Sequence, residues 1–331
     1  MTDSTILYNA DVYSSADPFA TAIMFTGDTV AWVGSDEAAC AFDGTHHDLA
    51  GAFVTPGLVA AAVDLRPEAG RPAPTGDELL ARGVTAAHLI GTGAQLERFA
   101  DAAPEALVTT SYQLGGAGEG RGALDAGALG AGARDAGSLP DGAQFVLVDS
   151  AADLSAVLGL LEDAGVRAHL QRHGWRLLIN VAVPPEAIDA LAQSGLGITV
   201  DPLAHRQPLA QLLSAGAQVS FALTAENPWQ TLRAAVYDSA DGVSARAAFN
   251  AVTRFGYRAL GSFDGGVLAP GSAATACVWS VESLLVQAAD SRVAAWSTDP
   301  RSGTPGLPDL SPDAALPQLL RIWSHGTAVT S

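Results

Sequence analysis

Short β-rich runs and helical stretches alternate through the middle of the chain, and this alternation limits the fold more than any other feature. The strand-like runs are residues 84–90, 107–114, 145–149, 177–182, 198–201 and 219–223. Helical patterns lie between several of them, at residues 151–164, 184–194 and 206–215, and a longer one follows at 245–260. Strands that alternate with helices predict a parallel sheet, either open or closed into a barrel.

The two ends of the chain have a different sequence pattern, with β-rich runs and no alternating helices. Residues 1–55 contain short β-rich runs separated by turn signals such as Gly27-Asp28, and similar runs return after residue 262. Each of these ends is too short to bury a core by itself. We therefore expect the two ends to meet in one small β domain.

Residues 115–143 are rich in glycine, alanine and aspartate. The run Gly115-Gly116-Ala117-Gly118-Glu119-Gly120 follows a predicted strand but lacks the GxGxxG spacing of a dinucleotide-binding turn. We expect this segment to be a flexible loop over one end of the sheet or barrel rather than a phosphate cradle.

The charged residues exclude several classes of function. All 17 basic residues are arginine and the chain has no lysine, which excludes a Schiff-base lysine, a P-loop lysine and a carbamylated lysine that bridges two metals. The 35 acidic residues give a net charge of −18, so nucleic acid and anionic membrane surfaces are not expected partners.

The remaining composition favours a cytoplasmic protein with reduced thiols. Cys40 and Cys277 are the only cysteines, too few for a four-cysteine zinc site or a disulfide framework. The residues after Met1 show no basic segment followed by an apolar one, so no signal peptide is expected. The apolar stretch at residues 49–65 is broken by Gly51, Pro56 and Gly57 and is too short to span a bilayer.

Several motifs resemble those of the amidohydrolase superfamily, in the branch that hydrolyses exocyclic amides and related bonds. Residues 48–65, DLAGAFVTPGLVAAAVDL, are similar to the segment that leads into the first barrel strand of that family. Residues 263–280, FDGGVLAPGSAATACVWS, resemble the return into its β domain. Residues 83–88 and 222–236 resemble a second-strand signature and the region after the last strand, so the resemblance spans almost the whole chain.

The resemblance implies an α/β fold: a TIM-like (β/α) barrel at residues 56–262, with a small β-sandwich formed by residues 1–55 and 263–331. It also implies a divalent metal at the carboxyl ends of the barrel strands, held by histidine and carboxylate ligands. The two histidines of the first-strand motif would fall at Ala62 and Asp64. The positions of a further glutamate and histidine are Asn180 and Val181, and Thr224 stands where the last-strand aspartate would be. Four of these five residues cannot do the work of the ligand or base they replace, so the resemblance predicts a degenerate member without the metal centre.

Polar side chains near the predicted strand ends are the candidate ligand-binding residues at the barrel mouth. They are Asp64, His88, Asn180, Asp201, His205, Thr224 and Glu226. The alternative role for Asp64 is a strand-end cap. The alternative role for His88 is a hydrogen-bonded structural histidine. His169 and His173 are four residues apart, a spacing that can clasp a metal on a helix, but no carboxylate partner is evident and Gly174 would end the helix.

Three functional hypotheses follow. The favoured one is a metal-independent homologue that has lost hydrolase activity and binds a small molecule or a protein, with no cofactor. The alternative is an active amidohydrolase that acts on C–N bonds with an atypical site around Asp64, His88 and Glu226, and that would use zinc. The third is a structural subunit that pairs with an intact relative. The sequence also leaves open that the protein forms a homodimer. No other hydrolase signature, such as GxSxG or HExxH, is present.

Overall fold

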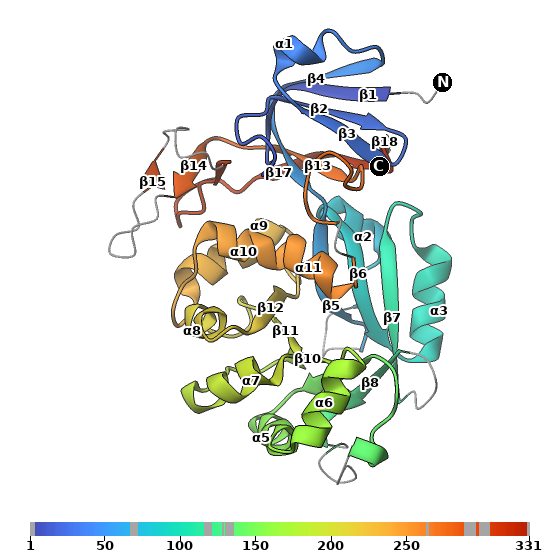
Figure 1. Cartoon of the computed structure of the whole chain (residues 1–331), viewed down its shortest axis with the longest axis vertical. Coiled ribbons are helices and arrows are strands. Elements are labelled where there is room, and N and C mark those ends of the chain that lie inside the picture. The colour runs from blue at the N-terminus through green and yellow to red at the C-terminus, as the bar shows by residue number, and fades with distance from the viewer. Residues whose placement is uncertain are drawn as a thin grey trace.

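The computed structural model describes residues 4–66, 72–115, 121–127, 129, 136–262, 265–287, 296–297 and 305–329. These residues form a parallel eight-stranded sheet that curls into a TIM-like barrel, and a separate β domain (Figure 1). The fold class predicted from the sequence is therefore correct.

The barrel strands follow one another in sequence order around the sheet. They are β5 (Leu58–Asp64), β6 (Val84–Gly91), β7 (Val108–Leu114), β8 (Gly122–Asp125), β9 (Gln144–Val148), β10 (Arg176–Ile179), β11 (Gly197–Val200) and β12 (Gln218–Phe221). Every neighbouring pair is parallel. β12 approaches β5, but no ladder joins these two described strands, so the barrel has a seam there.

Helices connect most of the strands and cover the outside of the barrel. They are α2 (Gly76–Ala81), α3 (Gly93–Ala102), α5 (Ala151–Leu161), α6 (Ala164–Arg172), η2 (Pro185–Ala187), α7 (Ile188–Ser194), α8 (Leu209–Ser214), α9 (Pro228–Arg233), η3 (Ala234–Asp238), α10 (Ala245–Val252) and α11 (Arg254–Ala259). Their apolar faces pack on the outward-facing residues of the strands in one large core.

Two helical stretches differ from their predicted bounds. The stretch predicted at 151–164 ends at Leu161, and a separate helix, α6, begins after Asp163, whose carboxylate accepts a hydrogen bond from the backbone N–H of Val166. This is an N-cap, which satisfies a donor that the first turn would otherwise leave unpaired. The second stretch breaks at Thr253, whose backbone leaves the helical region.

The glycine-rich segment contains a barrel strand, so the expectation that it is all flexible loop was wrong. β8 pairs with β7 on one side and with β9 on the other. Ala123 faces the barrel interior beside Phe145, which shows that small residues here serve packing rather than disorder. The part of the glycine run at residues 116–120 lies outside the described residues.

The β domain is built from both ends of the chain. Its sheet has the order β18-β17-β13-β4-β1-β2-β3. The strands are β1 (Ser4–Val12), β2 (Ala22–Thr26), β3 (Thr29–Gly34), β4 (Thr45–Pro56), β13 (Ala276–Ser280), β17 (Gln318–Ser324) and β18 (Thr327–Val329). The helix α1 (Asp36–Ala39) and three short strands, β14 (Leu284–Gln287), β15 (Trp296–Ser297) and β16 (Leu307–Pro308), accompany it. β4 joins the N-terminal strands to β13, which unites the two ends.

The β domain and the barrel meet where β4 runs into β5 through Gly57. A Cβ atom at this position would overlap the side chain of Thr85 on β6, so only glycine allows the backbone between β4 and β5 to lie this close to β6. Beside it, the indole N–H of Trp279 donates to the hydroxyl of Thr55 at 2.9 Å, and the Trp279 ring packs edge-on against Trp229. Division into domains at residues 55/56 and 262/263 remains a prediction.

No helix among the residues described above is long and apolar enough to cross a membrane.

Candidate functional site at the barrel mouth

Polar side chains gather at the carboxyl ends of the barrel strands. Asp64 ends β5 and Asp125 ends β8, while Asp149, Asn180 and Asp201 directly follow β9, β10 and β11. The strands alternate between inward and outward side chains, and their inward residues lead up to these positions. Because parallel strands converge at one end of a barrel, residues far apart in the sequence form a single site there.

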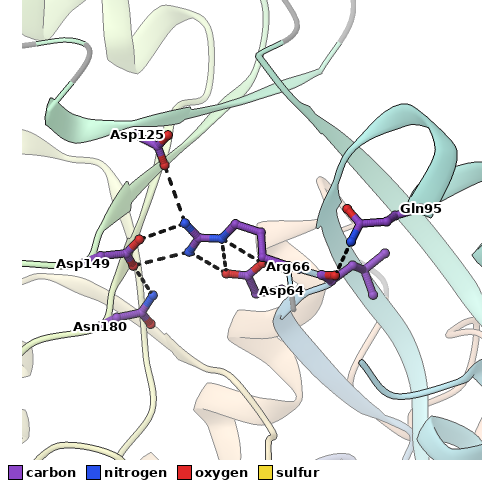
Figure 2. A network of polar contacts seen from close by, with 7 residues as sticks. Asp64, Arg66, Gln95, Asp125, Asp149 and Asn180 are labelled. Atoms are coloured by element: carbon purple, nitrogen blue, oxygen red, sulfur yellow. Dashed lines mark hydrogen bonds and ion pairs between the residues drawn. The ribbon is translucent and has the colours of Figure 1, made fainter. Parts of the chain in front are cut away.

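Arg66 lies at the centre of this group and binds two carboxylates (Figure 2). Its Nε and Nη2 donate to Oδ2 of Asp64 at 2.8 and 2.6 Å, and its Nη1 donates to Oδ2 of Asp149 at 2.8 Å. A third carboxylate, that of Asp125, is 3.6 Å from Nη1. Asn180 completes the network by donating its amide N–H to Oδ1 of Asp149 at 2.7 Å.

The electrostatics of this network fix its charge state. Partial burial alone would lower the pKa of Arg66, but the hydrogen bonds to Asp64 and Asp149 raise it above its ordinary value. Burial likewise opposes ionisation of Asp149, yet the hydrogen bonds from Arg66 and Asn180 lower its pKa below 3.8. At neutral pH the mouth therefore holds a charged guanidinium beside the ionised carboxylate of Asp149.

A second group of hydrogen-bonded side chains at the mouth consists of Asp201 and Thr224. The hydroxyl of Thr224 donates to Oδ2 of the buried Asp201 at 2.5 Å, and Oδ1 of Asp201 accepts the backbone N–H of Leu203. His205 lies on the same turn, where its backbone N–H donates to the carbonyl of Asp201. Asp201 is thus held by its own turn and by the segment after β12.

A cavity of about 270 Å³ opens beside these groups. Its walls include Ala62, Asp64, Arg66, Thr224 and Glu226. Ala62 and Thr224, two positions that the family resemblance would assign to metal chemistry, are therefore at the same end of the barrel. Arg82 and Glu78 also line this cavity, so both signs of charge surround it.

His88 is not at the mouth, contrary to the sequence-based expectation. β6 continues to Gly91, and in its register with β5 it is Ile90, two residues later, that pairs with Asp64. The imidazole is fully buried between the rings of Tyr112 and Phe145, and neither ring nitrogen has a hydrogen-bond partner among the described residues. Burial, followed by the charge of Arg176, keeps its pKa well below 6.5, so the ring is neutral.

A third group of polar side chains lies at the opposite end of the barrel and was missed in part from the sequence. His169 and His173 on α6 have a carboxylate partner after all, Asp141, which precedes β9. Nε2 of His173 is 3.3 Å from Oδ1 of Asp141, and the ligand atoms of all three residues lie within 4.8 Å of one another, close enough for the group to be a candidate metal site. A tertiary contact between a loop and a helix leaves no spacing signal, which is why Asp141 was missed.

These three residues precede β9 and β10, whereas Asp149 and Asn180 follow the same strands. The length of β9, five residues at ~3.3 Å each or about 16 Å, separates the two groups. The Asp141–His169–His173 group therefore cannot contribute ligands to the mouth.

No family model matches the sequence, and no curated protein matches it. Solved structures do share its fold. The atrazine chlorohydrolase TrzN from Arthrobacter aurescens TC1, complexed with zinc, is 16% identical, with a TM-score of 0.61 over 98% of this chain and 94% of that one. N-isopropylammelide isopropylaminohydrolase from Burkholderia multivorans is 14% identical, with a TM-score of 0.64 over 99% and 98%. An uncharacterised metal-dependent hydrolase from Pyrococcus furiosus is 13% identical, with a TM-score of 0.58 over 83% and 98%. The chain therefore has the barrel-plus-β-domain fold that these hydrolases share.

Proposed function

We propose that this chain is a degenerate member of the amidohydrolase superfamily that has lost metal-dependent hydrolysis and binds a small polar molecule at the barrel mouth. The sequence motifs and the shared fold support the family, although a fold alone does not confer an activity. The observation that carries the loss of activity is the position of Arg66.

The residues at the mouth do not fit a catalytic metal. Such a site needs about three protein ligands, usually including imidazoles, and an open position for water. At the matched positions Ala62 and Val181 offer no ligand atom, and Asn180 donates its amide N–H to Asp149. The guanidinium of Arg66, which stays charged at every physiological pH, forms ion pairs with both Asp64 and Asp149 and offsets one of their two negative charges. A divalent ion would have to displace Arg66 to reach them.

The cavity beside Arg66 supports the binding role. Its walls carry the carboxylates of Asp64 and Glu226 and the guanidinium of Arg82. Neither Arg82 nor Glu226 has an ion-pair partner among the residues that the structure covers, so both are free to meet a ligand. A small molecule that both donates and accepts hydrogen bonds matches these walls.

The alternative function is a metal-dependent hydrolase acting on C–N bonds. Within this fold, Asp64 and Glu226 line one cavity, as that reading requires, but His88 is buried beneath it. The observation that favours metal binding is instead the Asp141–His169–His173 group, two imidazoles and a carboxylate, at the other end of the barrel. The two candidate metal sites, the barrel mouth and this distal Asp141–His169–His173 group, therefore lie at opposite ends of the barrel.

Metal analysis after dialysis without chelator distinguishes the proposed function from the alternative hydrolase. The histidines of the Asp141–His169–His173 group must first be removed by mutation, so that metal bound there is not counted. We expect the double variant His169→Ala/His173→Ala to retain no stoichiometric zinc, manganese or nickel, and to have no activity on simple amides, ureas or formamides. Any metal in the wild-type protein should then disappear in this variant.

About one equivalent of metal in the double variant, lost on the further change Asp64→Asn, would overturn the proposal. Hydrolysis by the wild-type protein that disappears in the double variant would instead place an active metal at the distal end.

A further inference from the structure

The base of the barrel contains a buried arginine, Arg176, that has no counter-ion in the part of the chain that the structure describes. Arg176 begins β10, points into the barrel and is 8% exposed. No carboxylate lies within ion-pair distance of it among the described residues. An unpaired buried charge is costly, and charged side chains are almost never fully buried without a partner.

The contacts that Arg176 does make are neutral. Its Nη2 donates to the hydroxyls of Ser220 at 3.0 Å and Thr199 at 3.3 Å, and its guanidinium lies over the ring of Phe145 at 5.6 Å. Its Nε is buried without a hydrogen-bond partner among the described residues. These contacts hold the guanidinium in place but leave its charge uncompensated, and burial lowers its pKa to about 10.

A cavity of about 340 Å³ reaches this guanidinium from outside, beside the start of β12. Its walls include Arg176, Gln218, Ser220 and, from α11, Arg258. None of the residues that line it is acidic. In a chain with a net charge of −18, a cavity with two arginines and no carboxylate is a local reversal of the overall field.

The backbone close to Arg176 makes room for its guanidinium. Gly197 lies beside the guanidinium, and a Cβ atom there would overlap its Nη1. The backbone of β11 thus leaves space for the arginine that a larger residue would remove.

We propose that this cavity, which is separate from the mouth and independent of the function proposed there, binds a small oxyanion such as a phosphate or carboxylate group. Arg176 supplies a buried positive charge, Arg258 a second guanidinium at the entrance, and Gln218 a side-chain amide. Guanidinium groups suit such ligands because their N–H donors match two oxygens at once.

Isothermal titration calorimetry with inorganic phosphate, and separately with acetate, tests the proposal at low ionic strength, where screening is weak. We expect the wild-type protein to bind at least one of the two anions. Arg258→Met should weaken binding at least about tenfold, a loss of ~1.4 kcal/mol. Arg254→Met is the matched control, because Arg254 is exposed on the same helix and does not line the cavity. Its affinity should be unchanged.

Arg176→Met and Gly197→Ala should each abolish binding. Thermal unfolding without added anion gives a second readout, in which Arg176→Met should be at least as stable as wild type because it removes an uncompensated buried charge. Absence of binding of both anions by the wild-type protein would overturn the proposal. An equal loss in Arg254→Met and Arg258→Met would also do so, since it would indicate general electrostatics. If Arg176→Met does not fold, Gly197→Ala and the two α11 variants decide the question.

Discussion

Nη1 of Arg66 lies 2.8 Å from Oδ2 of Asp149, which joins a side chain just after β5 to one just after β9 across the barrel mouth. The same guanidinium binds Asp64 through Nε and Nη2. One arginine thereby holds together strands that are four places apart in the sheet. Its removal would leave the carboxylates of Asp64, Asp125 and Asp149 facing one another.

Arg66→Gln should therefore lower the free energy of unfolding and open the mouth to multivalent cations. We expect a loss of about 1–2 kcal/mol, between the values for exposed and for buried ion pairs, because Arg66 is half-buried. Terbium luminescence should report binding of Tb³⁺ to the variant but not to its control, Arg82→Gln. Arg82 lines the same cavity and makes no ion pair among the described residues. Equal Tb³⁺ binding by both variants would contradict the role given to Arg66.

Asp149→Asn should destabilise the protein in a pH-dependent way. The pKa of Asp149 is lowered from 3.8 in the folded state, so its ionised form contributes stability that is fully present above that pH. The contribution is lost as the pH falls through the lower, folded-state pKa. Urea unfolding at a series of pH values should show wild type and variant differing most near neutrality and converging in acid. A difference that does not depend on pH would mean that the ion pair is not its source.

His88→Phe should remove part of the pH dependence of stability below pH 6.5. The folded state keeps His88 neutral, whereas the unfolded chain binds a proton with a pKa near 6.5. Wild-type stability should therefore fall as the pH drops below 6.5, by up to about 1.4 kcal/mol per pH unit for this one group. Phenylalanine suits the aromatic surroundings of Tyr112 and Phe145 and does not titrate. The slope of the free energy of unfolding against pH should be compared between roughly pH 4.5 and 6.5, the range in which a histidine takes up its proton. Identical slopes for wild type and variant would show that His88 is protonated in the folded state.

Gly57→Ala should destabilise the junction between the β domain and the barrel. The added methyl group would overlap Thr85, whose hydroxyl lies 3.1 Å from that of Tyr257, so neighbouring side chains would have to move. Overpacking of this kind costs about 1–3 kcal/mol. The matched control is Gly159→Ala, at an exposed helical position with no atom near the new methyl group. It should be neutral or stabilising by up to about 1 kcal/mol. The unfolding temperature should fall for Gly57→Ala and stay level or rise for Gly159→Ala. A Gly57→Ala protein as stable as wild type would show that the close approach is relaxed easily.

The sequence by itself determined the architecture, because local patterns carry it. Alternating strands and helices require a parallel sheet, and β-rich ends that cannot bury a core alone must combine, as β4 and β13 do. The sequence also determined what stands at the matched strand-end positions, since Ala62 and Val181 have no ligand atoms in any fold. β8 was not predicted from the sequence, because its residues lie in a glycine-rich segment. Its strand conformation comes from pairing with β7 and β9 on its two sides.

Only the tertiary structure decided how the polar side chains meet. Arg66 was not among the candidate residues, because nothing in its local sequence shows that Asp149, 83 residues away, lies within hydrogen-bond distance. Asp141 joins His169 and His173 for the same reason. The depth of His88 depends on the register between β5 and β6. Which groups surround Arg176, with no carboxylate in ion-pair distance among the residues that the structure covers, depends on which strands pack around it. Periodicity records which face of an element is buried, whereas contacts between distant elements exist only once the barrel has closed.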